Sequence, residues 1–223
     1  MIGPQSELDG IAPLPRGRHG LSADEVSAHQ RERMLAAVAA VIAEEGYWSL
    51  TVEQVIDLAG VSRSTFYVHF ENKLEAALAA HEWVLERYLA EVQVACVAQG
   101  EWPMKVSAAL GATVDFIATR PRQAQVLSVG SMNADSALAA RVAMSQDRIA
   151  ELLTGLRPHS PHAAELPEST ERFLVAAIAS VLATWLRRGE EDDLAVLRAE
   201  LFELTLIPYY GATEAARIAG RAW

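Results

Sequence analysis

The chain has 223 residues, of which 51% are hydrophobic, and its formal net charge is −10. Alanine and leucine abound while proline and glycine separate periodic stretches, so the composition excludes a disordered chain and favours a helical globular protein. Cys96 is the only cysteine, which excludes an internal disulfide and suits a reducing cytoplasm. The longest apolar run, 14 residues at 173–186, is shorter than the roughly 20 that span a bilayer, so we expect a cytoplasmic protein without a membrane segment.

Residues 1–25 are rich in proline and glycine and lack an apolar run, which predicts a disordered N-terminal arm without a signal peptide. Two interpretations of this arm remain open. An inert tail is the simpler one, whereas Arg16, Arg18 and His19 could instead reach into a DNA minor groove. After the arm, apolar residues recur at helical spacing and predict a first helix from Ser27 to Glu45.

The stretch TVEQVIDLAGVSRSTFYVHFENK carries the strongest local signals of the chain. Thr51 is followed three residues later by a glutamine, which is the spacing of a capping box and predicts a helix start. Gly60 ends that helix, because glycine tolerates the left-handed backbone just past a helix terminus. Ser62 then caps a second helix, which runs from Arg63 to about Phe70. Two helices joined by a glycine turn predict a helix-turn-helix unit, whose second helix enters the major groove of DNA.

The second helix of this unit has two different faces. Phe66 and Phe70 lie four residues apart and can pack on the first helix. The other side chains offer a guanidinium, hydroxyls and an imidazole, which suit phosphate oxygens and base edges. Taken singly, Tyr67 could be a half-buried core residue and His69 a plain surface residue. Together at this spacing, these groups favour a DNA-reading face.

The segment GVSRSTFYVHFENK resembles the recognition-helix signature of the TetR family of bacterial transcriptional regulators. The likeness extends back through MLAAVAAVIAEEGYWSLTVEQVIDLAG and covers residues 31–78, about a fifth of the chain. The resemblance implies that one group of side chains contacts phosphates and another faces base edges. The implied phosphate contacts are Thr51, Thr65, Tyr67, His69 and Lys73. The implied base-edge contacts are Arg63, Ser64 and Val68, and the capping Ser62 completes the predicted DNA-binding set.

The overall charge is not that of an ordinary nucleic-acid binder, since residues 1–75 contain six Lys and Arg against eleven acids. Local placement must therefore supply the attraction to DNA. We expect it from Arg63, His69 and Lys73, and from free amides at the start of the helix that begins at Asn72. Few phosphate contacts per subunit and a modest non-specific affinity follow from this distribution.

The rest of the chain also reads as helical, so the predicted fold class is all-α. A three-helix DNA-binding domain with a helix-turn-helix at 26–75 precedes a larger helical ligand-binding and dimerisation domain at 76–223. No strand is predicted, and the clearest break is a loop at 156–166. The further helices are expected at 73–99, 103–118, 121–129, 134–155, 167–188, 191–209 and 213–220.

The helices between residues 170 and 209 are apolar around most of their circumference, more than one intramolecular contact can cover. A two-fold partner presenting the same pair would bury the excess in a four-helix interface, so we expect a homodimer that binds a palindromic operator. The resemblance implies the same arrangement. The predicted interface residues are Phe173, Leu174, Ile178, Val181, Leu182, Trp185, Leu197, Leu201 and Phe202.

The helices at 73–155 would enclose an effector pocket, and methionines suit an adaptable pocket as well as they suit a core. The effector is expected to be an apolar or mildly polar small molecule, which the resemblance does not name. The candidate pocket residues are His81, Tyr88, Met104, Phe116, Met132, Met144 and Trp185.

The body of the chain offers no enzyme chemistry, because it contains no GxG, no GK pair and no nucleophile signature around Cys96. His159 and His162 form an HxxH in a proline-containing loop, which favours a solvated loop over a metal site. We therefore expect neither a cofactor nor a metal. Two alternatives to a ligand-responsive repressor remain: a regulator without a small-molecule effector, and a helical enzyme or carrier with a borrowed helix-turn-helix.

Overall fold

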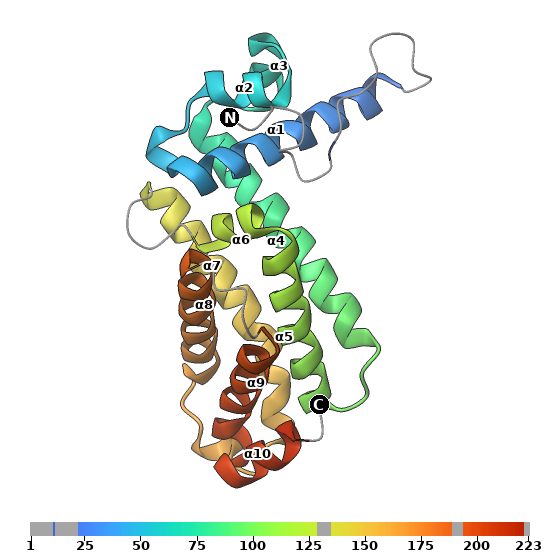
Figure 1. The fold of residues 1–223 in the computed structure, drawn as a ribbon, viewed down its shortest axis with the longest axis vertical. Coiled ribbons are helices and arrows are strands. Elements are labelled where there is room, and N and C mark those ends of the chain that lie inside the picture. Colours follow the sequence, from blue (N-terminus) through green and yellow to red (C-terminus); the bar gives the residue numbers. More distant parts are fainter. Residues whose placement is uncertain (1–10, 12–21, 129–134, 189–193, 221–223) are drawn as a thin grey trace. The chain divides into compact units, whose positions relative to one another are not determined.

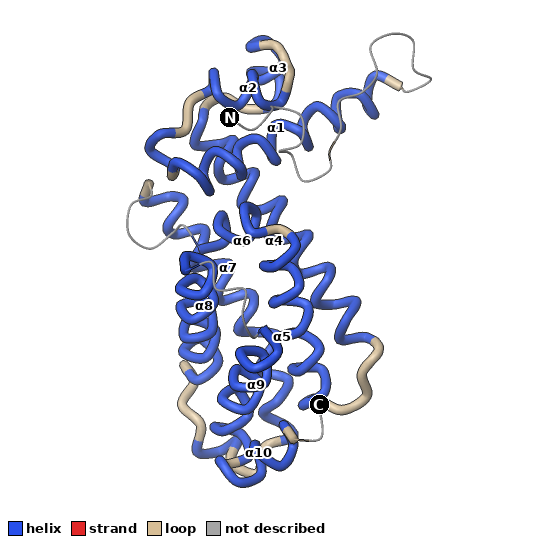
Figure 2. Tube along the Cα trace, in the orientation of Figure 1, coloured by secondary structure: helices blue, strands red, loops and turns tan. Residues whose placement is uncertain are grey.

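The computed structural model describes residues 11, 22–128, 135–188 and 194–220. Every regular element in these ranges is a helix and none is a strand, which confirms the all-α prediction (Figures 1 and 2). Among the described helices, none combines the length and the apolar character that crossing a membrane requires.

The chain forms two compact units. Unit 1 comprises residues 1–85 and 122–142, and unit 2 comprises residues 86–121 and 143–223. Helix α4 (Lys73–Val97) and helix α7 (Ser136–Leu153) each continue from one unit into the other. The domain boundary that we expect after residue 75 stays a prediction, and α4 runs through it without a break.

Unit 1 begins with helix α1 (Ala23–Glu45), which starts four residues earlier than predicted. Ser22 caps it in a capping box: the Glu25 amide donates to Ser22 Oγ (3.2 Å), and the Ser22 amide donates to a Glu25 carboxylate oxygen (2.7 Å). The expectation of disorder up to residue 25 is therefore wrong for residues 23–25. The basic positions of the predicted arm, Arg16, Arg18 and His19, lie outside the described residues.

The core of unit 1 is built around the apolar half of α1, where every residue from Met34 to Ile42 is buried. The short turn η1 (Tyr47–Ser49) leads from α1 to helix α2 (Val52–Ala59), which packs against α1. Helix α3 (Arg63–His69) follows, and α6 (Pro121–Ser128) lies almost wholly in this unit. The bounds of α2 and α3 agree with the predicted helix-turn-helix.

Unit 2 contains helix α5 (Trp102–Thr119), helix α8 (Thr170–Arg188), helix α9 (Leu194–Tyr210) and helix α10 (Ala212–Ala219). Helix α9 packs against α5, α8 and α10 and so lies at the centre of the unit (Figure 1). The segment predicted as a loop at 156–166 instead contains two 3-10 turns, η2 (Thr154–His159) and η3 (Ala163–Glu165). Helix-like turns form there because a tertiary network fixes the segment.

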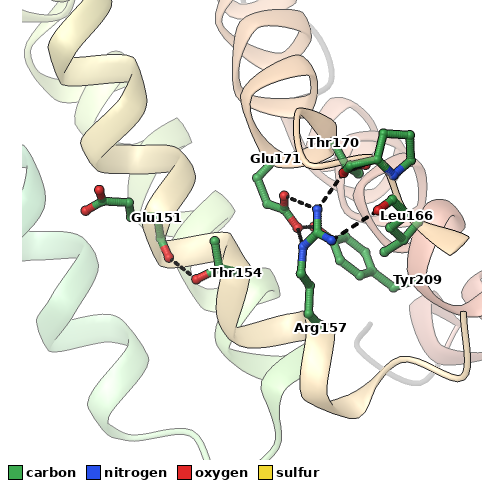
Figure 3. Close-up of polar contacts among 8 residues, drawn as sticks. Glu151, Thr154, Arg157, Leu166, Thr170, Glu171 and Tyr209 are labelled. Atoms are coloured by element: carbon green, nitrogen blue, oxygen red, sulfur yellow. Dashed lines mark hydrogen bonds and ion pairs between the residues drawn. The ribbon is translucent and has the colours of Figure 1, made fainter. Parts of the chain in front are cut away.

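That network is centred on Glu171, whose side chain is almost completely buried at the start of α8 (Figure 3). The Arg157 guanidinium donates to both Glu171 oxygens (2.8 and 2.7 Å) and to the carbonyls of Leu166 and Pro167 (3.3 and 2.6 Å). The Tyr209 hydroxyl donates to Glu171 Oε1 (2.8 Å). One buried carboxylate therefore joins η2, the start of α8 and the end of α9, and every partner it needs lies within unit 2.

Burial alone would raise the pKa of Glu171, but the hydrogen bonds from Arg157 and Tyr209 outweigh it and lower that pKa. A carboxyl group with a lowered native pKa stabilises the fold at pH values above its ordinary pKa. Its contribution is lost as the pH falls through the native pKa, because the protonated acid no longer pairs with Arg157.

Candidate nucleic-acid interface

The helix-turn-helix is fixed by the local signals that predict it. Thr51 and Gln54 form a capping box at the start of α2, in which the Gln54 amide donates to Thr51 Oγ1 (3.2 Å) and the Thr51 amide donates to Gln54 Oε1 (2.9 Å). Gly60 ends α2 with φ 64° and ψ 40°, the left-handed conformation that glycine adopts without strain. Beside this turn lies the guanidinium of Arg33, 3.4 Å from where a Cβ on Gly60 would stand.

The N-terminal end of α3 carries a cluster of hydroxyl groups. The Thr65 amide donates to Ser62 Oγ (3.0 Å), which makes Ser62 the N-cap. Ser62 Oγ also lies 2.8 Å from the hydroxyl oxygens of both Ser64 and Thr65. These three predicted DNA-binding residues therefore lie together, with hydroxyl groups that can turn from one another to a phosphate.

The two faces of α3 separate as predicted. Phe66 and Phe70 are buried, with their ring centroids 5.4 Å apart, and fasten the helix to unit 1. On the opposite face Tyr67 is 50% exposed and Val68 is 77% exposed. The Tyr67 ring meets Phe66 edge-on (5.4 Å, 87°), so the core holds one side of the ring while the residue stays half exposed.

Arg63 is held by an ion pair with Glu53 of α2. A hydrogen bond from the guanidinium to that carboxylate raises the pKa of Arg63, although both side chains are well exposed. The pair sets the direction of Arg63 in the DNA-free protein. Because it is exposed, it contributes little to stability and can open at little cost when another acceptor approaches.

His69 lies at the C-terminal end of α3 beside Arg31 of α1. Partial burial lowers the pKa of His69, and the nearby charge of Arg31 lowers it further by a smaller amount. The ring is therefore neutral at pH 7 and offers one hydrogen-bond donor and one acceptor. The exposed Arg31 guanidinium lies 5.5 Å from the centroid of the Phe70 ring. Sequence reasoning left Arg31 without a role, because no local periodicity connects it to α3.

Lys73 is directed toward the segment that precedes α2. Its ammonium donates to the carbonyls of Leu50 (3.0 Å) and Trp48 (3.4 Å) and lies 5.2 Å from the centroid of the Tyr47 ring. The expectation of free amides at the start of α4 is wrong for two of them. Asn72 Oδ1 accepts the amides of the second and third helical residues at 2.9 and 3.0 Å, as an N-cap side chain does.

The predicted pocket residues do not form one cluster. His81 is fully buried in unit 1, and neither ring nitrogen has a hydrogen-bond partner among the described residues. Tyr88 and Phe116 meet in unit 2, with ring centroids 5.6 Å apart, and the Tyr88 hydroxyl lies 2.9 Å from Thr113 Oγ1. Met144 is exposed and therefore lines no interior pocket, and Met132 lies outside the described residues.

Met104 lies elsewhere in unit 2, in an open recess of about 520 Å³ between the start of α5, η2, the end of α9 and α10. Trp102 forms one wall, and its indole occupies the space beside Gly155, where a Cβ would stand 2.0 Å from Cη2. The seventh candidate, Trp185, has a buried Nε1 without a hydrogen-bond partner among the described residues. No sequence pattern predicted the recess, because four separate elements form it.

The predicted dimer residues divide into two groups. Leu174, Leu182, Leu201 and Phe202 are buried in their own subunit, so their placement in a subunit interface is corrected to the subunit core. Ile178, Trp185 and Leu197 are half-buried. Phe173 and Val181 are exposed two helical turns apart on α8. Two exposed residues of α9 outside the predicted interface set, Val196 and Leu204, have the same spacing.

Parts of the chain are similar in sequence to known bacterial regulators. Residues 34–80 match the family model described as bacterial regulatory proteins of the tetR family. The transcriptional activator FasR of Mycolicibacterium smegmatis is 31% identical over 88 residues, which cover 40% of this chain and 40% of the relative. The transcriptional regulator CymR of Pseudomonas putida is 40% identical over 55 residues, which cover 25% and 27% of the two chains. The matches thus span less than half the length of these relatives.

Solved structures match over much more of the chain and show its fold. The fatty acid degradation regulator FadR of Bacillus halodurans has a TM-score of 0.68 at 18% identity, covering 79% of this chain and 94% of that one. A TetR-like regulator of Rhodococcus sp. RHA1 has a TM-score of 0.66 at 20% identity, covering 87% and 97%. FadR of Bacillus subtilis, solved in complex with stearoyl-CoA, has a TM-score of 0.67 at 18% identity, covering 79% and 97%.

Proposed function

We propose that this chain, which belongs to the tetR family of bacterial regulatory proteins, is a repressor that binds a palindromic operator as a homodimer and is released by a small molecule. The observation that carries the proposal is the outer face of α3. A capped, glycine-terminated α2 and two buried phenylalanines hold α3 rigidly, while its opposite face presents hydroxyls, Tyr67 and Val68 to solvent. A firmly held reading head with an exposed polar face is what major-groove recognition requires.

The predicted contacts differ in the chemical role that this proposal gives them. Arg63 would exchange Glu53 for a base edge, where its guanidinium can donate twice to guanine. Val68 would pack against a thymine methyl group. The hydroxyl groups of Thr65 and Tyr67, with those of Thr51, Ser62 and Ser64, would bind phosphates or base edges and fix the register of the helix.

The homodimer is supported by the exposed apolar side chains of α8 and α9. Phe173 and Val181 on one helix and Val196 and Leu204 on the other would face the same side chains of a second copy. Such a two-fold interface would present two copies of α3 to successive major grooves about 34–36 Å apart, which explains the expected palindrome.

Support for an effector comes from unit 2 and from its fold neighbours. Tyr88 and Thr113 pair their hydroxyl groups next to the Phe116 ring, which places one polar pair in the apolar interior of unit 2. The FadR of Bacillus subtilis was solved with stearoyl-CoA, a molecule with a long apolar chain. An acyl thioester of that kind is therefore the first probe for this chain. Its acyl chain fits the expected apolar or mildly polar effector, whereas its coenzyme A part carries charged phosphates.

Helix α4 would couple effector binding in unit 2 to DNA binding by unit 1, since it continues from one unit into the other and contains neither proline nor glycine. A ligand releases DNA only if it prefers a conformer whose two reading heads do not fit the operator. A coupling of roughly 1–3 kcal/mol would weaken operator binding about 5- to 150-fold, and DNA would weaken the ligand by the same factor.

The test is titration of the purified chain with the DNA upstream of its own gene, with and without stearoyl-CoA. We expect a dimer to bind one sequence in preference to random DNA, and we expect the ligand to weaken that binding. Specific binding that no ligand alters would favour the regulator without a small-molecule effector. Equal affinity for all DNA would contradict the proposed operator.

A further inference from the structure

Three large hydrophobic side chains are strongly exposed among the described residues of unit 1. Two of them, Tyr67 and Val68, belong to the outer face of α3, and the third is Trp48, which is 62% exposed in the turn η1. Burial of an indole stabilises a fold more than burial of most other side chains, yet the Trp48 indole stays exposed in this unit. A single exposed hydrophobic residue is ordinary, but Trp48 is also held in place by charged and aromatic neighbours.

The turn that carries Trp48 is anchored on both sides. Tyr47 is buried, and its ring meets the Trp48 indole edge-on with centroids 5.3 Å apart. The Lys73 ammonium donates to the Trp48 carbonyl at 3.4 Å and to the Leu50 carbonyl at 3.0 Å. The backbone of η1 therefore joins the start of α4 to the start of α2, where Thr51 is the N-cap. The exposed indole is presented by a fixed backbone.

We propose that Trp48 is a further DNA contact, whose indole packs on the sugar–phosphate backbone beside the groove that α3 enters. The inference rests on the proposed function, because it adds a residue to the same interface. The Lys73 ammonium and the positive end of the α2 dipole make the surroundings of η1 attractive to a phosphate. The indole offers a flat apolar face to a deoxyribose and one N–H donor to a phosphate oxygen.

The chemistry of the contact distinguishes it from that of the neighbouring lysine. Trp48 is uncharged, so its contact releases no counterion and adds nothing to the salt dependence of binding. Lys73 carries a charge, and removing a phosphate-binding lysine lowers the salt slope by about one. Although the Lys73 ammonium contacts the Trp48 carbonyl, replacing Trp48 and replacing Lys73 should therefore affect the salt dependence of DNA binding differently.

The experiment measures operator affinity, salt dependence and indole accessibility for the wild-type chain, Trp48→Ala, Trp48→Phe and Lys73→Ala. Trp48→Ala should weaken operator binding about tenfold, equivalent to roughly 1.4 kcal/mol, with an unchanged salt slope. Because the Trp48 indole is mostly exposed, the melting temperature of Trp48→Ala should stay close to that of the wild type. Val94→Ala is the matched control, since Val94 is exposed in unit 2, and it should bind DNA like the wild type.

Quenching of tryptophan fluorescence by acrylamide gives an independent measurement. Operator DNA should protect part of the wild-type emission, and Trp48→Phe should abolish the protected part even where it retains most of the affinity. Wild-type affinity in both Trp48 variants, together with quenching that DNA does not alter, would overturn the inference and leave the proposed function intact. A wild-type chain that bound no DNA at all would overturn both.

Discussion

Replacing His81 by leucine should remove a large part of the acid sensitivity of folding. The imidazole is fully buried in unit 1, and no described residue accepts or donates a hydrogen bond to either ring nitrogen. Burial lowers the pKa of His81 from 6.5 to about 4, with Glu82 opposing and Arg141 reinforcing the shift. Glu82 and Arg141 also pair with each other at 3.1 Å, so neither is a dedicated partner of the ring.

The sign of the effect follows from the direction of this shift. Between pH 6.5 and about pH 4 the unfolded chain binds a proton at residue 81 that the folded chain does not. The folded state is thus favoured fully above pH 6.5 and loses that advantage as the pH falls. The difference of about 2.5 pKa units amounts to about 3 kcal/mol, of which most is lost below pH 5.5.

Urea unfolding followed by circular dichroism between pH 7.5 and 4.5 measures this contribution. His81→Leu has no proton to bind and leaves no unpaired ring nitrogen, so its stability relative to the wild type should rise by about 2–3 kcal/mol as the medium is acidified. His159→Gln, which replaces an exposed histidine outside unit 1, is the control substitution. Parallel curves for the wild type and His81→Leu would refute the reasoning.

Three further substitutions test other parts of the molecule. Arg63→Ala should relax preference at one base position per half-site by about 1–3 kcal/mol in an operator library, whereas an even loss across all bases would contradict base readout. Val181→Glu should yield folded monomers by sedimentation, while Leu201→Glu should unfold the chain, because the first side chain is exposed and the second is buried. Tyr209→Phe removes a hydrogen bond to the buried Glu171 carboxylate and should lower the free energy of unfolding by about 1.5–3 kcal/mol in calorimetry; an unchanged melting temperature would assign that bond no weight.

The helix-turn-helix was predictable because its determinants are local. Caps at Thr51 and Ser62 and the glycine at position 60 act within three or four residues, and the structure reproduces each of them. The early start of α1 was also visible in the sequence as a Ser22–Glu25 capping box. The proline and glycine content of the preceding residues concealed it, because the average composition of a segment does not show at which residue a helix begins.

The faces of α8 and α9 could not be predicted from the same sequence. Both helices carry large apolar groups on most sides, so periodicity does not separate Leu201, which packs inside its subunit, from Leu204, which faces solvent. For a related reason, the sequence does not separate core from surface positions among the candidate pocket residues. His81 and Met144 are both residue types that suit a pocket. Tertiary packing alone places His81 in the core and Met144 on the surface.

The placement of charge explains how an acidic chain can carry a DNA-reading head. Arg63 pairs with Glu53, and Lys73 donates to the carbonyls of Leu50 and Trp48, so both predicted contacts are occupied in the DNA-free protein. A phosphate or base edge must replace these partners. The Glu53 carboxylate is exposed, so Arg63 exchanges it at little cost. Lys73 is bound more firmly, because its hydrogen bond to the carbonyl of the buried Leu50 is partly shielded from solvent. Random DNA offers only the phosphate part of that exchange, against the repulsion of a chain with net charge −10. Under the proposed function, only a sequence that also fits the outer face of α3 would add base contacts, so the acidic chain would favour specific over non-specific binding.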